Sequence, residues 1–198
     1  MAGKLKVLTR AQIAQLSVIQ NALEVLDWVL YDRLPVLLGG TATQFTFFQQ
    51  AVGQAGITKD TTNLEIPGQL PAGHEFVCQK IIFEAQPNQA AGIVAAYAQD
   101  AVNLTHYGWG QFNIGSRPYL EAPLKNFIGG NLQGFSGVVT TAYAQSRTVV
   151  NGEMEYAPVI PANYSFNVQA NYPAAPVVAA DGFIRAQMIG KLIRPRQG

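Results

Sequence analysis

The sequence predicts a mainly β protein, an antiparallel β-sandwich of jelly-roll type with an N-terminal helical arm and one inserted helix. Three observations favour this class. Turn residues separate about eight or nine stretches of strand character, roughly one every ten residues. A chain of 198 residues is long enough for one such domain with an appended arm. A proline turn leads into an aromatic residue and a strand twice, before Phe76 and before Phe166.

The repeated lead-in indicates a core made of two sheets. Residues 70–79 and 160–169 share the order apolar, Pro, Ala, Gly or Asn, two residues, Phe, one residue, apolar, Gln. Strands at equivalent places of two facing sheets need the same turn geometry, although two similar turns can also arise by chance. If the two motifs are similar because their structures are similar, Phe76 and Phe166 are core residues at the start of two long strands.

The first residues predict a helical arm, residues 1–38, which precedes the sandwich domain, residues 39–198. Thr9 and Gln12 have the spacing of a capping box, in which each side chain accepts a hydrogen bond from the backbone of the other. Apolar residues then recur at steps of three and four, which predicts an amphipathic helix over residues 10–26. These apolar residues are Ile13, Leu16, Ile19, Leu23 and Leu26.

The end of the arm is ambiguous, and the whole arm is a candidate subunit contact. Residues 28–31 fit either a continued helix or the start of a strand, and Pro35 is expected to end either one. The apolar stripe must be covered by the sandwich or by a neighbouring subunit. The polar face is rich in amides rather than in Lys and Arg, which disfavours a membrane anchor. The candidate interface residues are Leu16, Ile19, Leu23, Trp28 and Tyr31.

Turn residues divide the rest of the chain into strands and one helix. Residues 76–85 carry apolar residues on both alternating faces, which is typical of a central strand. Residues 89–103 are rich in alanine and free of proline, and they predict the inserted helix. Asn151-Gly152 is the strongest hairpin signal. Other strands are expected at residues 43–48, 106–114, 117–124, 137–144, 147–150, 164–170 and 183–193.

The composition predicts an obligate homo-oligomer. Charged residues make up 13% of the chain, about half the usual ~25% of soluble domains. Glutamine and asparagine supply the polarity instead, and amides are desolvated at an interface more easily than ions. An ordinary monomer with an amide-rich surface is the alternative.

The N-terminus is basic. Lys4, Lys6 and Arg10 occur there without an acidic residue between them. Such a cluster is a candidate contact for nucleic acid or anionic lipid, and a solvated basic tail is the simpler interpretation.

Residues that carry catalysis or bind metals are sparse. Cys78 is the single cysteine and lies in a predicted strand, so no intrachain disulfide can form. His74 and His106 lack the spacing of a zinc site. Glu153 and Glu155 would suit a glycosidase only beside a sugar cleft, and exposed hairpin charges are the simpler interpretation. We therefore expect no enzyme, no metal, no cofactor and no small-molecule substrate.

Several short motifs resemble the jelly-roll coat proteins of tailless icosahedral bacterial viruses. They are residues 62–71, the lead-in at residues 160–166, and the terminal Gly-Lys-Leu-Ile-Arg-Pro-Arg-Gln of residues 190–197. The resemblance covers residues 40–197 and leaves the arm unmatched. It implies a capsid shell subunit of a bacteriophage virion, assembled in the host cytoplasm. The partners it implies are copies of the chain, other capsid subunits, and viral genome or an internal membrane.

Two other functions compete with a shell subunit. A carbohydrate-binding jelly roll would use aromatic side chains as a stacking platform, for which Tyr107, Trp109 and Tyr119 are the candidates. A hydrolase is disfavoured by the scarcity of convergent titratable residues.

Overall fold

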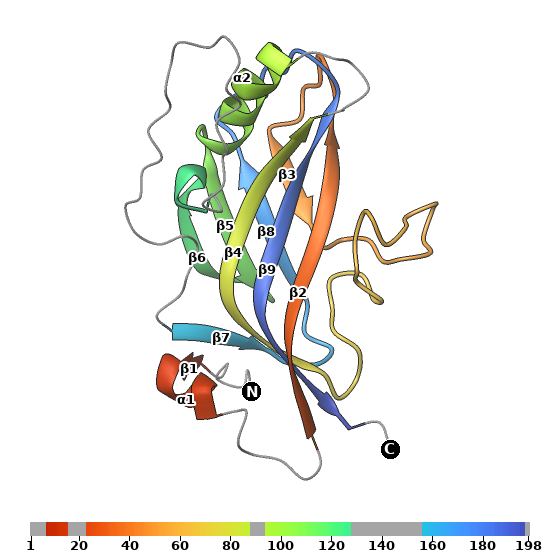
Figure 1. The fold of residues 1–198 in the computed structure, drawn as a ribbon, viewed down its shortest axis with the longest axis vertical. Coiled ribbons are helices and arrows are strands. Elements are labelled where there is room, and N and C mark those ends of the chain that lie inside the picture. Colours follow the sequence, from red (N-terminus) through yellow and green to blue (C-terminus); the bar gives the residue numbers. More distant parts are fainter. Residues whose placement is uncertain (1–6, 16–22, 88–93, 128–155, 197–198) are drawn as a thin grey trace.

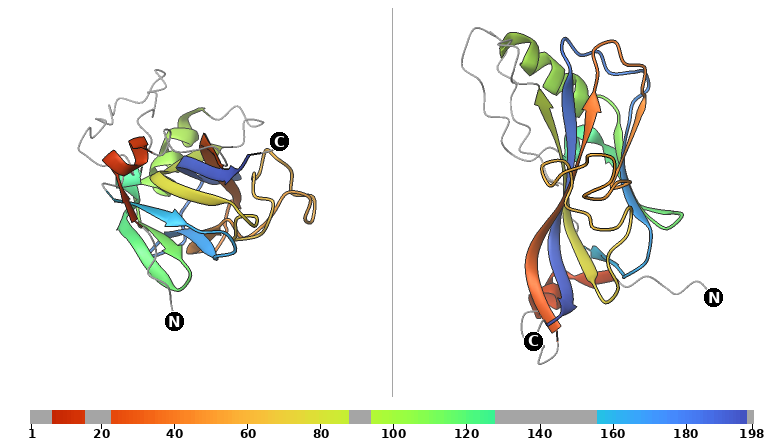
Figure 2. Two further views of the ribbon diagram at one scale, coloured as in Figure 1. Left: turned by 90° about the horizontal axis from the view of Figure 1, so that it is seen from below. Right: turned by 90° about the vertical axis from the view of Figure 1, so that its right-hand side faces the viewer.

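The computed structural model describes residues 7–15, 23–87, 94–127 and 156–196 as two antiparallel sheets that face each other (Figure 1). The larger sheet has the strand order β1-β7-β4-β9-β2, and the smaller sheet has the order β3-β8-β5-β6. The protein is therefore mainly β and has the layers of an antiparallel sandwich. The lower ends of β2 and β9 extend beyond the smaller sheet in both side views (Figures 1 and 2).

The strands follow the predicted order closely where both can be compared. The larger sheet contains β1 Val7–Thr9, β2 Leu23–Val36, β4 Glu75–Pro87, β7 Tyr156–Ile160 and β9 Gly182–Pro195. The smaller sheet contains β3 Gln44–Phe47, β5 Trp109–Ile114, β6 Arg117–Pro123 and β8 Phe166–Asn171. Strands β1 and β7 were missing from the sequence prediction, and β2 was expected only as an alternative to helix over residues 28–31. The strands expected at residues 137–144 and 147–150, and the Asn151-Gly152 hairpin, lie outside the described residues.

The helices are short. Helix α1 spans Arg10–Gln15, helix α2 spans Val94–Thr105, and a 3-10 helix, η2, spans Leu124–Phe127. Helix α2 lies between β4 and β5, which confirms an inserted helix at this place in the chain. Its Asp100 carboxylate accepts hydrogen bonds from the backbone N–H of Ala179 at 2.9 and 3.0 Å. This contact ties the helix to the loop that precedes β9.

Strand β9 is the centre of the larger sheet. It pairs with β2 on one side, from Leu23 opposite Pro195 to Val36 opposite Gly182, and with β4 on the other. The β4 pairing contains a bulge between Cys78 and Lys80. Gly190 lies at this bulge, where an added Cβ atom would lie 1.9 Å from the carbonyl oxygen of Val77. Only glycine allows this close approach of the two backbones.

The structure corrects the extent of the N-terminal arm. The capping box is confirmed, because Thr9 N donates to Gln12 Oε1 at 3.0 Å and Gln12 N donates to Thr9 Oγ1 at 3.4 Å. However, residues 23–26, predicted as helix, begin strand β2. Residues 23–36 belong to the larger sheet, so a boundary at residue 38 does not separate an arm from the sandwich.

Backbone pairing explains why this stretch is a strand. Leu23 and Leu26 fit helical spacing, but each residue of β2 lies opposite a partner on β9, and tertiary pairing overrides a local periodicity. Pro35 does not end the strand as expected. The odd-numbered residues of β2 direct their N–H groups away from β9, as the bond from Tyr31 N to Asn63 Oδ1 shows. The missing N–H of Pro35 therefore removes no bond between the strands.

The core lies between the two sheets. Phe83 of β4 packs edge to face with Phe47 of β3 at 5.7 Å between ring centroids, and with Phe127 of η2 at 5.5 Å. Phe76 and Phe166 are exposed by 0% and 1%, and they belong to opposite sheets. Both residues that the repeated lead-in predicted to be core residues are therefore buried between the sheets.

The two lead-ins share their backbone geometry and touch each other. Gly73 and Asn163 occupy the same place in the two motifs and have φ angles of 78° and 61°. Asn163 N donates to Leu70 O at 3.3 Å, and Phe166 N donates to Gly68 O at 2.8 Å. The repeat thus marks one site at which strands of both sheets begin.

A second apolar cluster lies apart from the main core. Leu8 of β1 and Ile13 of α1 are buried against Val77, Ala157, Val159 and Ile193 of the larger sheet. Of the apolar stripe, Ile13 is therefore covered by the protein's own sheet, whereas Leu23 is 42% exposed and Leu16 and Ile19 lie outside the described residues.

Phe76→Ala and Phe166→Ala should each lower the free energy of unfolding by ~3 to 5 kcal/mol, because each leaves a cavity in a packed core. Urea denaturation followed by fluorescence measures the effect. Tyr164→Ala is the matched control, because this aromatic residue lies in the same lead-in but is 43% exposed, and it should change stability little. A midpoint of either core variant equal to that of the control would refute the core assignment.

Candidate interaction site at the edge of β2

The outer edge of β2 is covered over its upper half by the chain's own loop. Asn63 accepts a hydrogen bond from Tyr31 N through Oδ1 at 3.0 Å and donates from Nδ2 to Val29 O at 2.7 Å. Thr62 Oγ1 donates to Tyr31 O at 3.0 Å. Residues 62–63 thus occupy the place of a further short strand, and the edge is closed there.

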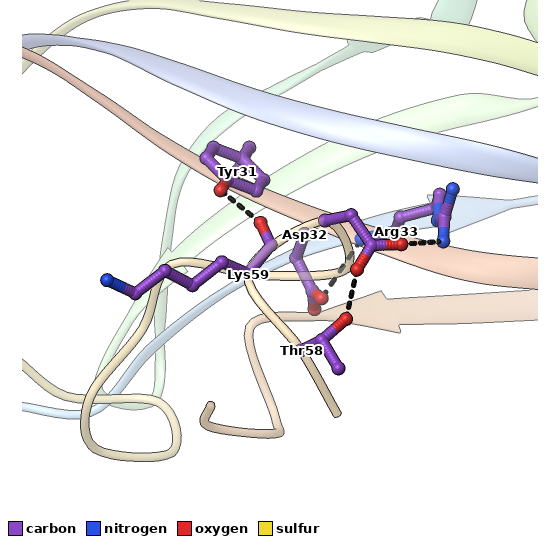
Figure 3. A network of polar contacts seen from close by, with 6 residues as sticks. Tyr31, Asp32, Arg33, Thr58 and Lys59 are labelled. Carbon is purple, nitrogen blue, oxygen red and sulfur yellow. Dashed lines mark hydrogen bonds and ion pairs between the residues drawn. The ribbon is translucent and has the colours of Figure 1, made fainter. Parts of the chain in front are cut away.

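Polar side chains hold the same loop further along (Figure 3). Arg33 Nη2 donates to Asp60 Oδ2 at 2.9 Å, and Thr58 Oγ1 donates to the other carboxylate oxygen of Asp60. The hydroxyl of Tyr31 donates to the carbonyl oxygen of Lys59. The Thr58 hydroxyl, with the nearby Arg33, lowers the pKa of Asp60 below its usual value. The loop is therefore anchored by β2 at several consecutive residues.

Asp32 is a buried carboxylate at the centre of this arrangement. Its side chain is on the core side of β2 and the residue is 2% exposed. It accepts hydrogen bonds from Arg33 N at 3.0 Å and from Phe48 N. Phe48 has a φ of 67°, an unusual conformation for a bulky residue that this bond helps to hold. Burial raises the pKa of Asp32 to about 6, against the opposing effect of the two backbone N–H groups.

The outer face of the larger sheet carries two arginines beside this loop. Arg33 and Arg185 lie directly opposite each other on β2 and β9, an arrangement that is unfavourable for like charges. Each guanidinium instead lies over an aromatic ring, Arg33 over Phe183 at 4.2 Å and Arg185 over Tyr31 at 5.7 Å. Cation–π contacts and the Asp60 carboxylate thus compensate the repulsion.

The lower half of the β2 edge is open among the described residues. The loop contacts end at Val29, and Leu23, Val25 and Asp27 below it direct their backbone N–H and C=O groups to the same free side. We call residues 23–28 the open segment of β2. The right-hand view of Figure 2 looks onto this side of the molecule.

The side chains of the open segment do not protect it from pairing. Asp27 is paired with Lys191 at 2.6 Å, and Glu24 with Arg194 at 2.8 Å, so both carboxylates are neutralised by β9. Leu23 is 42% exposed and Trp28 is 38% exposed. Natural edge strands usually carry unpaired charge, proline or a bulge to prevent association, and the open segment has none of these.

The predicted interface residues thus fall into three groups. Leu23 and Trp28 are exposed on the open segment, while Tyr31 is engaged by the loop over the upper half of the edge. Leu16 and Ile19 lie outside the described residues. Asp32 and Asn63, which hold the loop, were missed because a buried acid and a loop amide have no sequence signal without the β2 pairing.

The predicted basic contacts are only partly described. Lys4 and Lys6 lie outside the described residues, and Arg10 is the first residue of α1.

The three aromatic candidates for sugar stacking do not form one platform. Tyr107 and Trp109 are 60% and 39% exposed near the start of β5. Trp109 lies opposite Pro123, at one end of the β5–β6 hairpin. Tyr119 lies toward the other end, where its ring packs against Phe112 in the core at 6.4 Å between centroids.

Other candidates for chemistry stay apart from each other. Within the described ranges, no three His, Cys, Asp or Glu side chains come together as metal ligands. Cys78 is fully buried, and burial raises the pKa of its thiol far above the usual value. Glu153 and Glu155 lie outside the described residues.

Comparison with known proteins gives no relative: no protein family, curated protein or solved structure matches the chain. A search of the described residues for membrane-spanning helices finds none of sufficient length and apolar character.

Asp32 should make stability depend on pH. Because its folded pKa of about 6 exceeds the usual 3.8, its contribution is fully present below pH ~3.8 and is lost as pH rises through 6. The free energy of unfolding of the native protein, relative to Asp32→Asn, should therefore fall between pH 4 and 7, by on the order of 3 kcal/mol. Denaturation at several pH values measures this difference. If the stability of Asp32→Asn depends on pH as steeply as that of the native protein, the assignment is wrong.

Proposed function

We propose that the sandwich is a jelly roll and that the chain is a structural subunit of a virion shell, without catalytic activity. The observation that carries the proposal is the order of the described strands. Strands β2 to β9 form two groups of four, with the order β2-β9-β4-β7 in the larger sheet and β3-β8-β5-β6 in the smaller sheet. Of these, strands that follow each other in the sequence lie in opposite sheets, except for β5 and β6, which form a hairpin. Eight strands wound in this way are what two Greek keys of a jelly roll require, and viral capsid domains use this architecture.

A fold alone does not define a function, so the surface must support it. Apolar side chains are exposed at the end of the sandwich opposite the open segment. Leu37, Leu38 and Val177 are exposed by 57%, 62% and 77%. They belong to two neighbouring loops, which are joined by the bond from Leu38 N to Asp181 Oδ1 at 2.7 Å. Exposed apolar groups at both ends favour a subunit that is covered by copies of itself and by other capsid subunits.

The remaining partners follow from the same proposal. The basic residues Lys4, Lys6 and Arg10 would contact the viral genome or an internal lipid membrane from the inner side of the shell. The protein would then be found in virions and assemble in the host cytoplasm.

Carbohydrate binding is the second candidate, because lectins also use jelly rolls. The exposed Tyr107 and Trp109 favour it. A glycan array with Trp109→Ala as the control separates this function from assembly.

Purified full-length protein should form large assemblies, because its exposed apolar ends are covered only by self-association. Sedimentation velocity and negative-stain electron microscopy at micromolar concentration and moderate salt should show shells, sheets or other regular oligomers. A stable monomer under these conditions would contradict the proposed function.

A further inference from the structure

We propose that the open segment of β2 pairs antiparallel with the open segment of a second copy, about a two-fold axis at Leu26. The inference rests on the proposed function, because the pairing would be one contact between shell subunits. It names the residues that make this contact, which the proposed function alone does not.

The hydrogen-bonding groups of the edge determine what kind of partner fits. Leu23, Val25 and Asp27 present a row of backbone N–H and C=O groups that another extended backbone can satisfy in register. On the upper half of the same edge, the side chains of Thr62 and Asn63 satisfy such groups, and no described residue does so on the lower half. The lower half is therefore suited to an added strand, and a shell subunit always has a second copy available to supply it.

Charge favours one register of the pairing. With Leu26 on the axis, Asp27 lies opposite Val25 of the second copy and Leu23 lies opposite Val29 of the second copy. A shift that centres Asp27 would place two carboxylates directly opposite each other, which is destabilising. The register about Leu26 avoids this juxtaposition and leaves Asp27 with its own Lys191. Unlike a register centred on Val25, which places Leu23 opposite Asp27, it also gives Leu23 an apolar neighbour.

The same register covers the exposed apolar side chains. Leu23 and Val29, exposed by 42% and 38%, become cross-strand neighbours on one face. Trp28 lies on the other face beside Leu26, next to the axis. Pairs of this kind between apolar residues stabilise antiparallel strands. Pairing thus joins two larger sheets edge to edge, and the hydrogen bonds between Val25 and Asp27 of the two copies lie below Val29, which the loop residue Asn63 contacts.

Cysteine cross-linking of assembled full-length protein tests the axis. Residues that face each other without sharing hydrogen bonds have Cα atoms ~4.5 Å apart, within reach of a disulfide. Leu26→Cys should therefore give disulfide-linked dimers under mild oxidation, read on non-reducing gels and by peptide mapping. Asp27→Cys is the control. Its side chain is 86% exposed, yet the Cα atoms of two such residues would lie ~8 Å apart, too far to bridge. The native Cys78 is buried and should stay reduced.

A second variant tests the edge by hydrogen bonding. Val25→Pro removes an N–H that points away from β9, so the variant should keep its β-sheet circular dichroism. Combined with Leu26→Cys, it should abolish the disulfide-linked dimer. A folded chain that carries both substitutions and still gives this dimer would overturn the inference.

The outcomes separate this inference from the proposed function. If assemblies form but Leu26→Cys gives no disulfide-linked dimer, or Asp27→Cys gives as much dimer, the β2 pairing is wrong. The proposed function as a shell subunit is not contradicted by that result. A protein that never assembles overturns both. Selective cross-linking at residue 26 supports the pairing.

Discussion

The larger sheet depends on a single strand that is paired along almost its whole length on both sides. β9 lies between β2 and β4, and each of its fourteen residues faces a partner on β2. This pairing turns a stretch of helical spacing into a strand and leaves β2 as the last strand of the sheet. Because β2 is the last strand, its free edge must be covered, and the positions of Asp32, Asn63 and the loop follow from that need.

The two halves of the β2 edge differ in what covers them. Above Val29 the chain covers the edge with its own loop, anchored by side chains of β2 and by the buried Asp32 carboxylate. Below Val29, no described residue covers the edge, and its carboxylates are neutralised from β9. One half is covered by the chain itself, and the charges of the other, open half are paired within the sheet. This is what a subunit needs if it folds alone and then associates through a defined segment.

The sequence predicted the β-sandwich but not the free edge of β2. Periodicity and turn residues located most described strands, and the repeat before Phe76 and Phe166 located two core residues, because these signals are local. Leu23 to Leu26 have spacing that fits helix as well as strand, so only the distant partner β9 decides between them. For the same reason, the sequence could not predict that Asp32 helps to hold the loop. A single acid in an apolar stretch acquires its role only when Phe48 and residues 62–63 are folded against it.

The central claim is that one half of the β2 edge is reserved for another chain, and amide hydrogen exchange of the full-length protein tests it most directly. In dissociated protein, Leu26 and Trp28, which bond to β9, should exchange slowly, while Val25 and Asp27 should exchange fast. In assemblies, Val25 and Asp27 should become as protected as their neighbours, whereas Tyr31, already bonded to Asn63, should change little. Val25 and Asp27 amides that remain fast in assemblies would contradict the account.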